Sequence, residues 1–386
     1  MENSEYGRSL LDFASEAVKT QSYSDQEGNF AELIADKMKE LNFDDVTIDR
    51  AGNVIGRVGN GPTVIQFDSH MDTVEVNDAD LWKVPPFEGR IADGSLWGRG
   101  SVDMKSALCA SVYAAAAAKE QGLLEGKTVY VTGTVCEEYC DGVNLKELYK
   151  DSGIRPDYCI ICEPSGNIIT LGHKGKAQIL ITTHGVSAHG SAPEKGVNAV
   201  YEMADIIKRV EALNKKLSEK EGAHGTIVLS KISSVSASLN AVPSSCSIYL
   251  DRRLALGETL EQVKEEMDEL IEGIDASWEV GNLEHTSWNG ARLFYAPMHD
   301  PWKIAEDHPL TLAMNEAYEQ AAGHAPESYN FWDFGTNAIT PVAMGIPTIG
   351  FGPGAYKLAH MRDEHCSTDE IIQACDIYKN LFDILK

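Results

Sequence analysis

The sequence predicts an α/β protein in which a mostly parallel central sheet, flanked by helices, is interrupted by a smaller inserted α+β domain. Three observations support this fold class. β-rich runs alternate with helix-like segments toward both ends of the chain. The middle of the chain has a β-α-β-β-α-β order. The chain has 386 residues, more than a single hydrophobic core usually serves, so two domains are expected.

Four short β-rich runs belong to the larger predicted domain. Each is followed by a loop and then a helix-like segment, which is the pattern of a parallel sheet covered by helices. The runs span residues 63–74, 127–138, 157–166 and 346–354. The predicted helices of this domain include the alanine-rich segment 105–122 and the later segments 308–323 and 368–385.

A different order of elements begins near residue 175. Strand, helix, two strands, helix and strand follow one another, as in ferredoxin-like domains, which can close a small core of their own. The predicted strands are 176–189, 225–235, 246–255 and 277–283, and the helices are 198–217 and 259–274. We therefore expect residues 175–293 to form an inserted domain, and residues 1–174 and 294–386 to form the larger one.

Composition and charge exclude several classes of partner. The formal net charge is −26, so the chain has no excess of cations to neutralise phosphates and would repel nucleic acids and anionic lipids. No apolar run reaches the ~18 residues that span a bilayer. The first residues lack the pattern of a signal peptide. We expect a cytoplasmic protein without nucleic-acid or membrane partners.

Eight cysteines lie mostly inside apolar runs, where free cysteine behaves as a small hydrophobic residue. In a reducing cytosol we expect no structural disulfides. Cys159 and Cys162 form a CxxC pattern, but no second pair follows at the spacing of a zinc ribbon. Buried strand residues are therefore favoured over a redox or structural-zinc role.

Ionisable residues gather where the predicted strands end. The carboxyl ends of parallel strands form the edge at which open α/β sheets bind their ligands. Five side chains are expected at this edge: His70, Asp72, Glu137, Glu138 and Glu163. His70 and Asp72 are two residues apart and would point to the same side of a strand. Asp72 could then receive the second ring N–H of a metal-binding His70, although a surface pair is an equal alternative.

The remaining acids have their own alternatives. Asp103 lies in a glycine-bearing loop, where it could approach a metal ion or simply cap the next helix. Glu137 and Glu138 are adjacent and would face opposite ways in a strand, so one could bind metal while the other holds the attacking water. A solvated acidic edge is the alternative. Glu163 follows apolar residues, and a buried carboxylate needs a partner or a metal.

Taken together, these residues indicate a metal centre. His360 is the last candidate ligand, with His365 as its competitor five residues on. Two histidines and three carboxylates are ligands that Zn²⁺ accepts. One shared carboxylate could hold two ions ~3.5–4 Å apart, as in two-metal hydrolases.

At these residues the sequence resembles the zinc exopeptidase and deacylase family of acetylornithine deacetylase, succinyl-diaminopimelate desuccinylase, aminoacylase and carboxypeptidase G. The resemblance covers nearly the whole chain. Within the family, the sequence is most similar to the hydrolase branch associated with bacterial selenium metabolism. Its motifs, in order, are SHMDTV, GRGSVDMK, TVCEEYCDG, CEPSG, GVSAHGSAPEKGVNA, LNAVP with DRR following, and AHMRDE. The resemblance implies a metallopeptidase domain with an inserted lid and dimerisation domain.

The resemblance also implies a role for each residue. His70 and Glu163 would hold one Zn²⁺, Glu138 and His360 the other, and Asp103 would bridge them. Glu137 would be the general base, and Asp72 would assist the catalytic site. In the inserted domain the resemblance implies that His189 stabilises the oxyanion of the tetrahedral intermediate, often across a dimer interface. It also implies that Asn240 and Arg253 contact the substrate carboxylate. A strand-end histidine and a surface cation are the alternatives for His189 and Arg253.

The expected function is hydrolysis of an amide or peptide bond beside a carboxylate, in an N-acyl amino acid or short peptide. Two Zn²⁺ per chain are expected, with Co²⁺ or Mn²⁺ possible, and the protein is expected to be a homodimer through the inserted domain. A non-catalytic metal-binding or scaffold protein on the same fold is the alternative. Asn337 and His365 depart from residues that relatives often have, so they bear on substrate identity.

Overall fold

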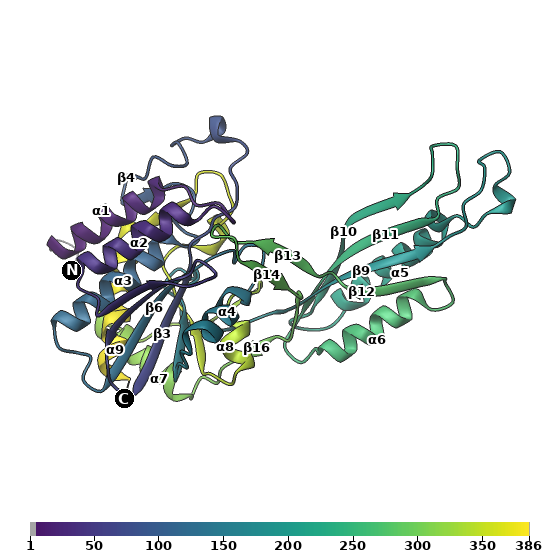
Figure 1. Ribbon diagram of the computed structural model, residues 1–386. Helices are drawn as coiled ribbons and strands as arrows, with labels where there is room; N and C mark the ends of the chain where they lie inside the picture. Colours follow the sequence, from purple (N-terminus) through teal and green to yellow (C-terminus); the bar gives the residue numbers. More distant parts are fainter. Residues whose placement is uncertain (1–4, 386) are drawn as a thin grey trace.

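The computed structural model describes residues 5–385 and has two parts, a broad α/β body and an elongated extension (Figure 1). Both chain termini lie in the body. The extension is built from the middle of the chain, so the chain leaves the body once and returns to it. The inserted arrangement predicted from the sequence is confirmed.

A nine-stranded sheet forms the centre of the body, in the order β1-β2-β6-β3-β7-β18-β8-β16, with β17 paired to β8. The four strands from β6 to β18 (β6, β3, β7 and β18) are parallel to one another, as predicted. Antiparallel pairs extend the sheet on both sides and were not predicted. The strands are β1 (Asp45–Ile48), β2 (Val54–Gly59), β3 (Thr63–His70), β6 (Lys127–Thr134), β7 (Tyr158–Ile161), β8 (Thr170–His173), β16 (Trp302–Lys303), β17 (Asn330–Trp332) and β18 (Thr348–Gly350).

The alanine-rich helix α3 (Lys105–Glu120) packs on β2, β3 and β6 and against α1 (Glu5–Lys19) and α9 (Thr368–Ile384). It is buried along almost its whole length. Small side chains all round a helix suit such a buried position, because they let neighbours approach from every side. The other helices of the body are α2 (Gly28–Glu40), α4 (Val143–Ser152), α7 (Pro309–Ala322) and α8 (Ile339–Ala343).

The extension is an antiparallel sheet covered on one face by two helices. Its strand order is β10-β11-β9-β12, with β15 paired to β9, so the β-α-β-β-α-β block has the ferredoxin-like arrangement. Burial alternates along β9 and β11, and the buried set packs against the helices in a second core. The elements are β9 (Gly175–His184), α5 (Ala199–Ser218), β10 (Thr226–Val235), β11 (Ser245–Leu254), α6 (Leu260–Ile271), β12 (Ala276–Val280) and β15 (Met298–His299).

A hairpin of β13 (Leu283–Thr286) and β14 (Arg292–Tyr295) joins the two parts. Its Trp288 indole lies against Gly52, whose φ of +97° and lack of a side chain leave room for the ring. The Leu293 and Tyr295 side chains belong to the core of the body. The predicted division at residue 293 falls inside β14, and we keep the domain limits as a proposal.

Several short elements complete the chain. A small sheet in the order β19-β5-β4 lies beside the loops that lead into α3. Among residues 5–385 no helix is both long and apolar enough to cross a membrane. All eight cysteines are buried and free, and Cys159 lies within β7. The short elements are β4 (Arg90–Ala92), β5 (Ser95–Trp97), β19 (His365–Ser367), η1 (Ala79–Leu81), η2 (Pro193–Lys195) and η3 (Tyr356–Leu358).

Candidate metal centre

A pocket of ≈ 280 Å³ lies at the carboxyl ends of β3, β6 and β7, the edge predicted from the sequence. His70 is the last residue of β3, and Glu163 follows β7. Glu137 and Glu138 come after β6. The structure therefore brings together acids and a histidine that are up to 93 residues apart, because neighbouring parallel strands end at one edge.

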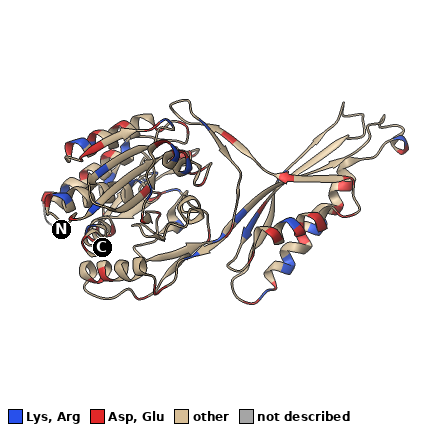
Figure 2. Cartoon of the chain, turned by 60° about the horizontal axis from the view of Figure 1, so that its bottom comes forward, with Lys and Arg blue, Asp and Glu red and all other residues tan. Residues whose placement is uncertain are grey.

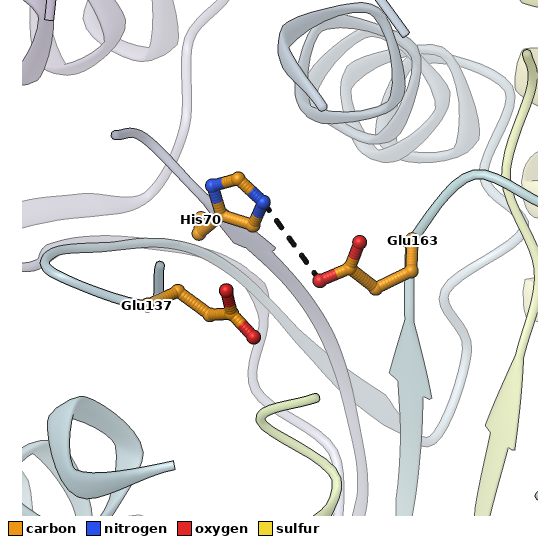
Figure 3. A group of neighbouring side chains, drawn as sticks. All are labelled: His70, Glu137 and Glu163. Carbon is orange, nitrogen blue, oxygen red and sulfur yellow. Dashed lines mark ion pairs between the residues drawn. The ribbon is translucent and has the colours of Figure 1, made fainter. Parts of the chain in front are cut away.

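His70 is the buried centre of the first group of donors. Its Nε2 lies 2.9 Å from Asp103 Oδ1 and 3.8 Å from Glu163 Oε1 (Figure 3). Its Nδ1 lies 2.9 Å from the backbone oxygen of Asp72 and 3.5 Å from the Asp72 carboxylate. A ring N–H on Nδ1 donates to that carbonyl, which leaves the Nε2 lone pair for a metal ion. The second ring nitrogen of His70 is thus held chiefly by the backbone oxygen of Asp72 and less closely by its carboxylate.

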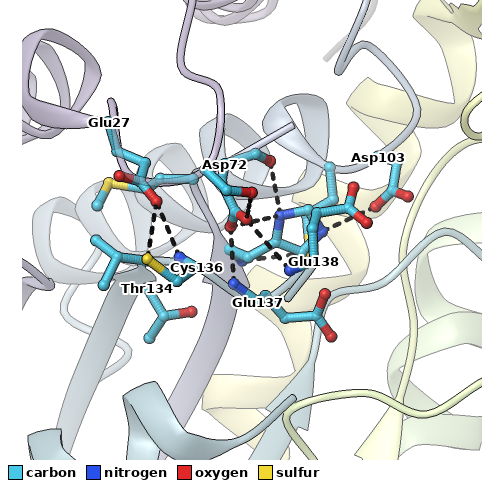
Figure 4. Close-up of polar contacts among 12 residues, drawn as sticks. Glu27, Asp72, Asp103, Thr134, Cys136, Glu137 and Glu138 are labelled. Atoms are coloured by element: carbon cyan, nitrogen blue, oxygen red, sulfur yellow. Dashed lines mark hydrogen bonds and ion pairs between the residues drawn. The ribbon is translucent and has the colours of Figure 1, made fainter. Parts of the chain in front are cut away.

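The Asp72 carboxylate has another role. It accepts hydrogen bonds from the backbone N–H groups of Glu137 (3.0 Å) and Glu138 (3.2 Å) and from the Ser24 hydroxyl (2.7 Å) (Figure 4). β6 ends at Thr134, so the two glutamates lie in a turn. The expectation that strand alternation separates them was wrong, and Asp72 instead holds the turn that carries both.

A second group surrounds the carboxylate of Asp103. His360 Nε2 lies 3.2 Å from Asp103 Oδ2 and 3.0 Å from the Glu138 carboxylate. Asp103 thus contacts both histidines, one through each oxygen. His365 lies apart from this group, because its ring stacks on Trp97 with centroids 4.2 Å apart. The geometry favours His360 over His365.

The donor atoms fit divalent metal ions. Those of His70, Glu137 and Glu163 lie within 4.8 Å of one another, and so do those of His70, Asp103 and Glu138. Imidazole nitrogen and carboxylate oxygen are ligands that Zn²⁺ accepts. Glu137 belongs to the first of these two groups, so its place in the pocket does not by itself separate a ligand role from a base role.

The electrostatics of the pocket also favour a cation. Burial raises the pKa of Glu137 well above its ordinary value, and repulsion from Glu163 adds to the effect. Burial likewise raises the pKa of Glu163, with a further contribution from Asp103. Hydrogen bonds to Asp103 and Glu138 raise the pKa of His360 to about 10. Crowded buried carboxylates are costly to ionise without positive charge, and divalent ions would supply it.

The predicted substrate residues of the extension lie at its two ends. Arg253 lines the pocket, and its side chain pairs with Asp251. His189 and Asn240 lie together in exposed loops, where the Gly190 N–H donates to the Asn240 carbonyl. These loops are beyond His184, the end of β9 that is remote from the pocket. At ~3.3 Å per residue, a strand of this length spans roughly 30 Å.

Three further polar contacts, in the pocket and behind it, were not predicted. Lys176 donates to Asp141 at 2.8 Å, and the Tyr295 hydroxyl donates to the same oxygen at 3.0 Å. Asn337 donates to the Asp68 carboxylate at 2.8 Å. Asp141 stands four residues after Glu137 in the same motif, which is the one signal that could have drawn attention to it.

Comparisons with known proteins agree with this geometry. The model of peptidase family M20/M25/M40 matches residues 67–383. The protein YgeY of Escherichia coli strain K12 is 35% identical over 97% of this chain and 94% of its own. A probable succinyl-diaminopimelate desuccinylase of Staphylococcus epidermidis is 27% identical over 95% of each chain. The M20 metallo-carboxypeptidase Sso-CP2 of Sulfolobus solfataricus has a similar fold, with a TM-score of 0.74, 18% identity and 99% of both chains covered.

Proposed function

Because the chain belongs to peptidase family M20/M25/M40, we propose that it is a two-metal hydrolase that cleaves an amide or peptide bond beside a carboxylate. One observation carries the proposal. The Asp103 carboxylate lies between His70 and His360, one oxygen toward each, as a ligand shared by two ions would. A relative named as a desuccinylase supports an amide substrate.

In this proposal each ion has two ligands of its own beside the shared Asp103. His70 and Glu163 hold one ion, and Glu138 and His360 hold the other. Bound Zn²⁺, or Co²⁺ or Mn²⁺ in its place, would polarise the scissile carbonyl and lower the pKa of an attacking water. This assignment leaves the Glu137 carboxylate free of a ligand role.

Glu137 is then the general base. It is buried in the pocket wall, and its backbone N–H is fixed by Asp72. A carboxylate that binds neither ion can take a proton from the attacking water and release it again to the leaving amine. A protein that only stored or sensed metal would not require an unligated acid at this position.

The substrate carboxylate would be bound by Arg253. Asp251 occupies the Nε and Nη2 edge of its guanidinium, at 2.7 and 3.0 Å, which fixes the plane of the group. The remaining edge can then pair with a carboxylate. The pocket is small, in keeping with an N-acyl amino acid or a short peptide as substrate.

We also propose a homodimer through the extension. β10 is an edge strand whose Val228, Ile232 and Val235 side chains are all more than half exposed. Figure 2 shows charges concentrated on the helices of the extension, whereas its strands are mostly uncharged. An apolar edge of this kind is usually covered by a partner, and twofold pairing is the commonest solution. The predicted cytoplasmic location belongs to the same proposal.

The test begins with metal content and continues with hydrolysis. Purified protein loaded with Zn²⁺, Co²⁺ or Mn²⁺ is expected to hold two ions per chain by elemental analysis and to hydrolyse members of a panel of N-acyl amino acids and dipeptides. A chelator should abolish the reaction, and added metal should restore it. Two bound ions without hydrolysis would favour a non-catalytic metal-binding protein, and full activity in excess chelator would overturn the metal-dependent mechanism.

A further inference from the structure

The geometry points to Arg99 and Glu364 as positioning residues that fix the loops of two proposed metal ligands, Asp103 and His360, against each other. The inference rests on the proposed two-metal centre and adds residues outside its ligand set. Arg99 lies in the loop between β5 and α3, and Glu364 immediately precedes β19. Both are buried, with exposures of 4% and 0%.

Glu364 holds the Asp103 loop through its backbone. Its Oε1 accepts hydrogen bonds from the N–H groups of Val102 (2.8 Å) and Asp103 (3.1 Å). Its own carbonyl accepts from the Gly98 N–H at 2.9 Å, at the start of the same loop. The Asp103 side chain has no part in these bonds, so both its oxygens stay directed at the histidines.

Arg99 connects this arrangement to the loop of His360. Its Nη1 donates to Glu364 Oε2 at 2.5 Å. The same guanidinium donates to the backbone oxygens of Met361 and His360, each at 3.4 Å. The cation also lies 5.3 Å from the centroid of the Trp82 ring. One buried ion pair therefore touches the main chain on both sides of the proposed centre.

His360 needs such external support more than His70 does. The His360 side chain is 51% exposed, whereas that of His70 is 1% exposed. His360 also has a φ of +61°, a left-handed conformation that is costly for a residue with a Cβ. Neither burial nor intrinsic backbone preference keeps its imidazole in place. The Arg99 contacts to its carbonyl and to the next residue restrain this loop from one side, and the Arg362–Asp78 ion pair and the hydrogen bond from the Lys83 N–H to Asp363 hold its later residues.

The consequence is unequal for the two proposed ions. Loosening the Arg99–Glu364 pair should chiefly weaken the ion held by Glu138 and His360. The ion held by His70 and Glu163 should be less affected, because His70 ends a central strand. Residues that orient metal ligands from outside the ligand set typically contribute 10–100-fold to metal affinity.

The experiment is a Zn²⁺ and Co²⁺ titration of full-length protein, read by calorimetry and by the visible spectrum of bound Co²⁺. In Arg99→Met and Glu364→Gln, the affinity of one binding step should fall ~10–100-fold, with the other step changed far less. Arg99→Lys keeps the charge beside Glu364 but shortens the reach to the His360 loop. It should fold well and show a smaller loss of the same step.

Arg252→Met is the matched control. Arg252 is equally buried, pairs with Glu258 and Glu266, and lies in the core of the extension. This variant should lose thermal stability and bind both ions as the wild type does. If Arg99→Lys and Arg99→Met keep both wild-type affinities, the positioning role is wrong while the metal centre stands. A wild-type protein that binds no divalent ion would overturn the centre and the inference together.

Discussion

Asn337 donates its side-chain amide to the Asp68 carboxylate at 2.8 Å, two residues before His70 on β3. The same amide nitrogen donates to the Thr134 hydroxyl at 3.0 Å, and the amide oxygen accepts from the Gly142 N–H at 2.8 Å. The side chain therefore ties the ends of β3 and β6 to the segment that follows Glu137 and Glu138. It also explains why an amide suits this position, since a second acid would face Asp68.

The first prediction tests this pairing. Asn337→Asp should lower the free energy of unfolding at pH 7 by about 3 kcal/mol, because it buries a second carboxylate beside Asp68 without a cation. Urea unfolding measures the change. The exchanged double variant Asn337→Asp with Asp68→Asn should regain most of the loss, since it restores one acid and one amide. Equal stability of the single variant and the wild type would show that the acid is tolerated.

Much of the fold could be predicted from the sequence because it depends on local patterns. The parallel strands at the centre of the body, helix α3 and the order of elements in the extension follow from periodicity and from turns between neighbouring segments. The convergence of His70, Glu137 and Glu163 follows from one topological rule about the ends of parallel strands. The antiparallel strands on both sides of the sheet depend on pairings between distant segments and had no comparable signal.

The supporting contacts of the site could not be predicted from the sequence, because they also join segments that are distant along the chain. Glu364 bonds to residues about 260 positions away, and Asn337 reaches across 269 positions to Asp68. Glu364 stands in the AHMRDE motif, which drew attention for His360, and Asn337 drew attention only as a departure from relatives. The turn at Glu137 and Glu138 was misread as strand because the apolar run before it continues past the end of β6.

The second prediction concerns the proposed base. Glu137→Gln should lower the rate of hydrolysis by ~10²–10⁴ at saturating substrate, because the amide cannot accept a proton from water. Both metal ions should remain bound, since the proposed ligand set does not include Glu137. Elemental analysis and steady-state kinetics check the two parts together. A variant that lost one ion per chain would show instead that Glu137 is a ligand.

The third prediction uses an ion pair in the extension. Burial alone would raise the pKa of Glu258, but hydrogen bonds from Arg252 and Lys220 lower it to about 2. A carboxyl group whose pKa is lower in the folded state than in the unfolded state stabilises the fold. This contribution is complete at pH values above the ordinary pKa of 4.5 and is lost as the pH falls from there toward 2. Glu258→Gln should therefore be less stable than the wild type at pH 7, by about 2 kcal/mol, with the gap closing below pH 4.5.

Thermal unfolding from pH 7 to pH 3 measures that gap. Glu261→Gln is the control, because Glu261 lies on the exposed surface of α6 and pairs only with Lys264 at 3.3 Å among the described residues. Exposed pairs of this kind contribute little. A Glu258→Gln gap that stayed constant with pH would contradict the linkage.

The last prediction concerns His189, which lies at the end of the extension that is remote from the pocket of its own chain. The Ser191 N–H donates to its Nδ1 at 3.1 Å, so the neutral ring carries its proton on Nε2. An exposed N–H donor is suited to an oxyanion, and in this chain no oxyanion could form near it. A dimer through β10 could bring the loops of His189 and Asn240 to the pocket of the partner.

Activity would then require two chains, which subunit mixing can detect. Asp103→Ala protein lacks the shared metal ligand, and His189→Ala protein lacks the oxyanion donor, so each alone should be nearly inactive. A hybrid dimer has one complete site, with metal ligands from the His189→Ala chain and the histidine from the Asp103→Ala chain. With Asp103→Ala in excess and exchange verified by mass, most His189→Ala chains should enter such hybrids and activity should return.

Because Asn240 lies beside His189, Asn240→Ala mixed with Asp103→Ala should be rescued in the same way. Full exchange without recovery, or a fully active monomer in sedimentation, would place the oxyanion donor elsewhere.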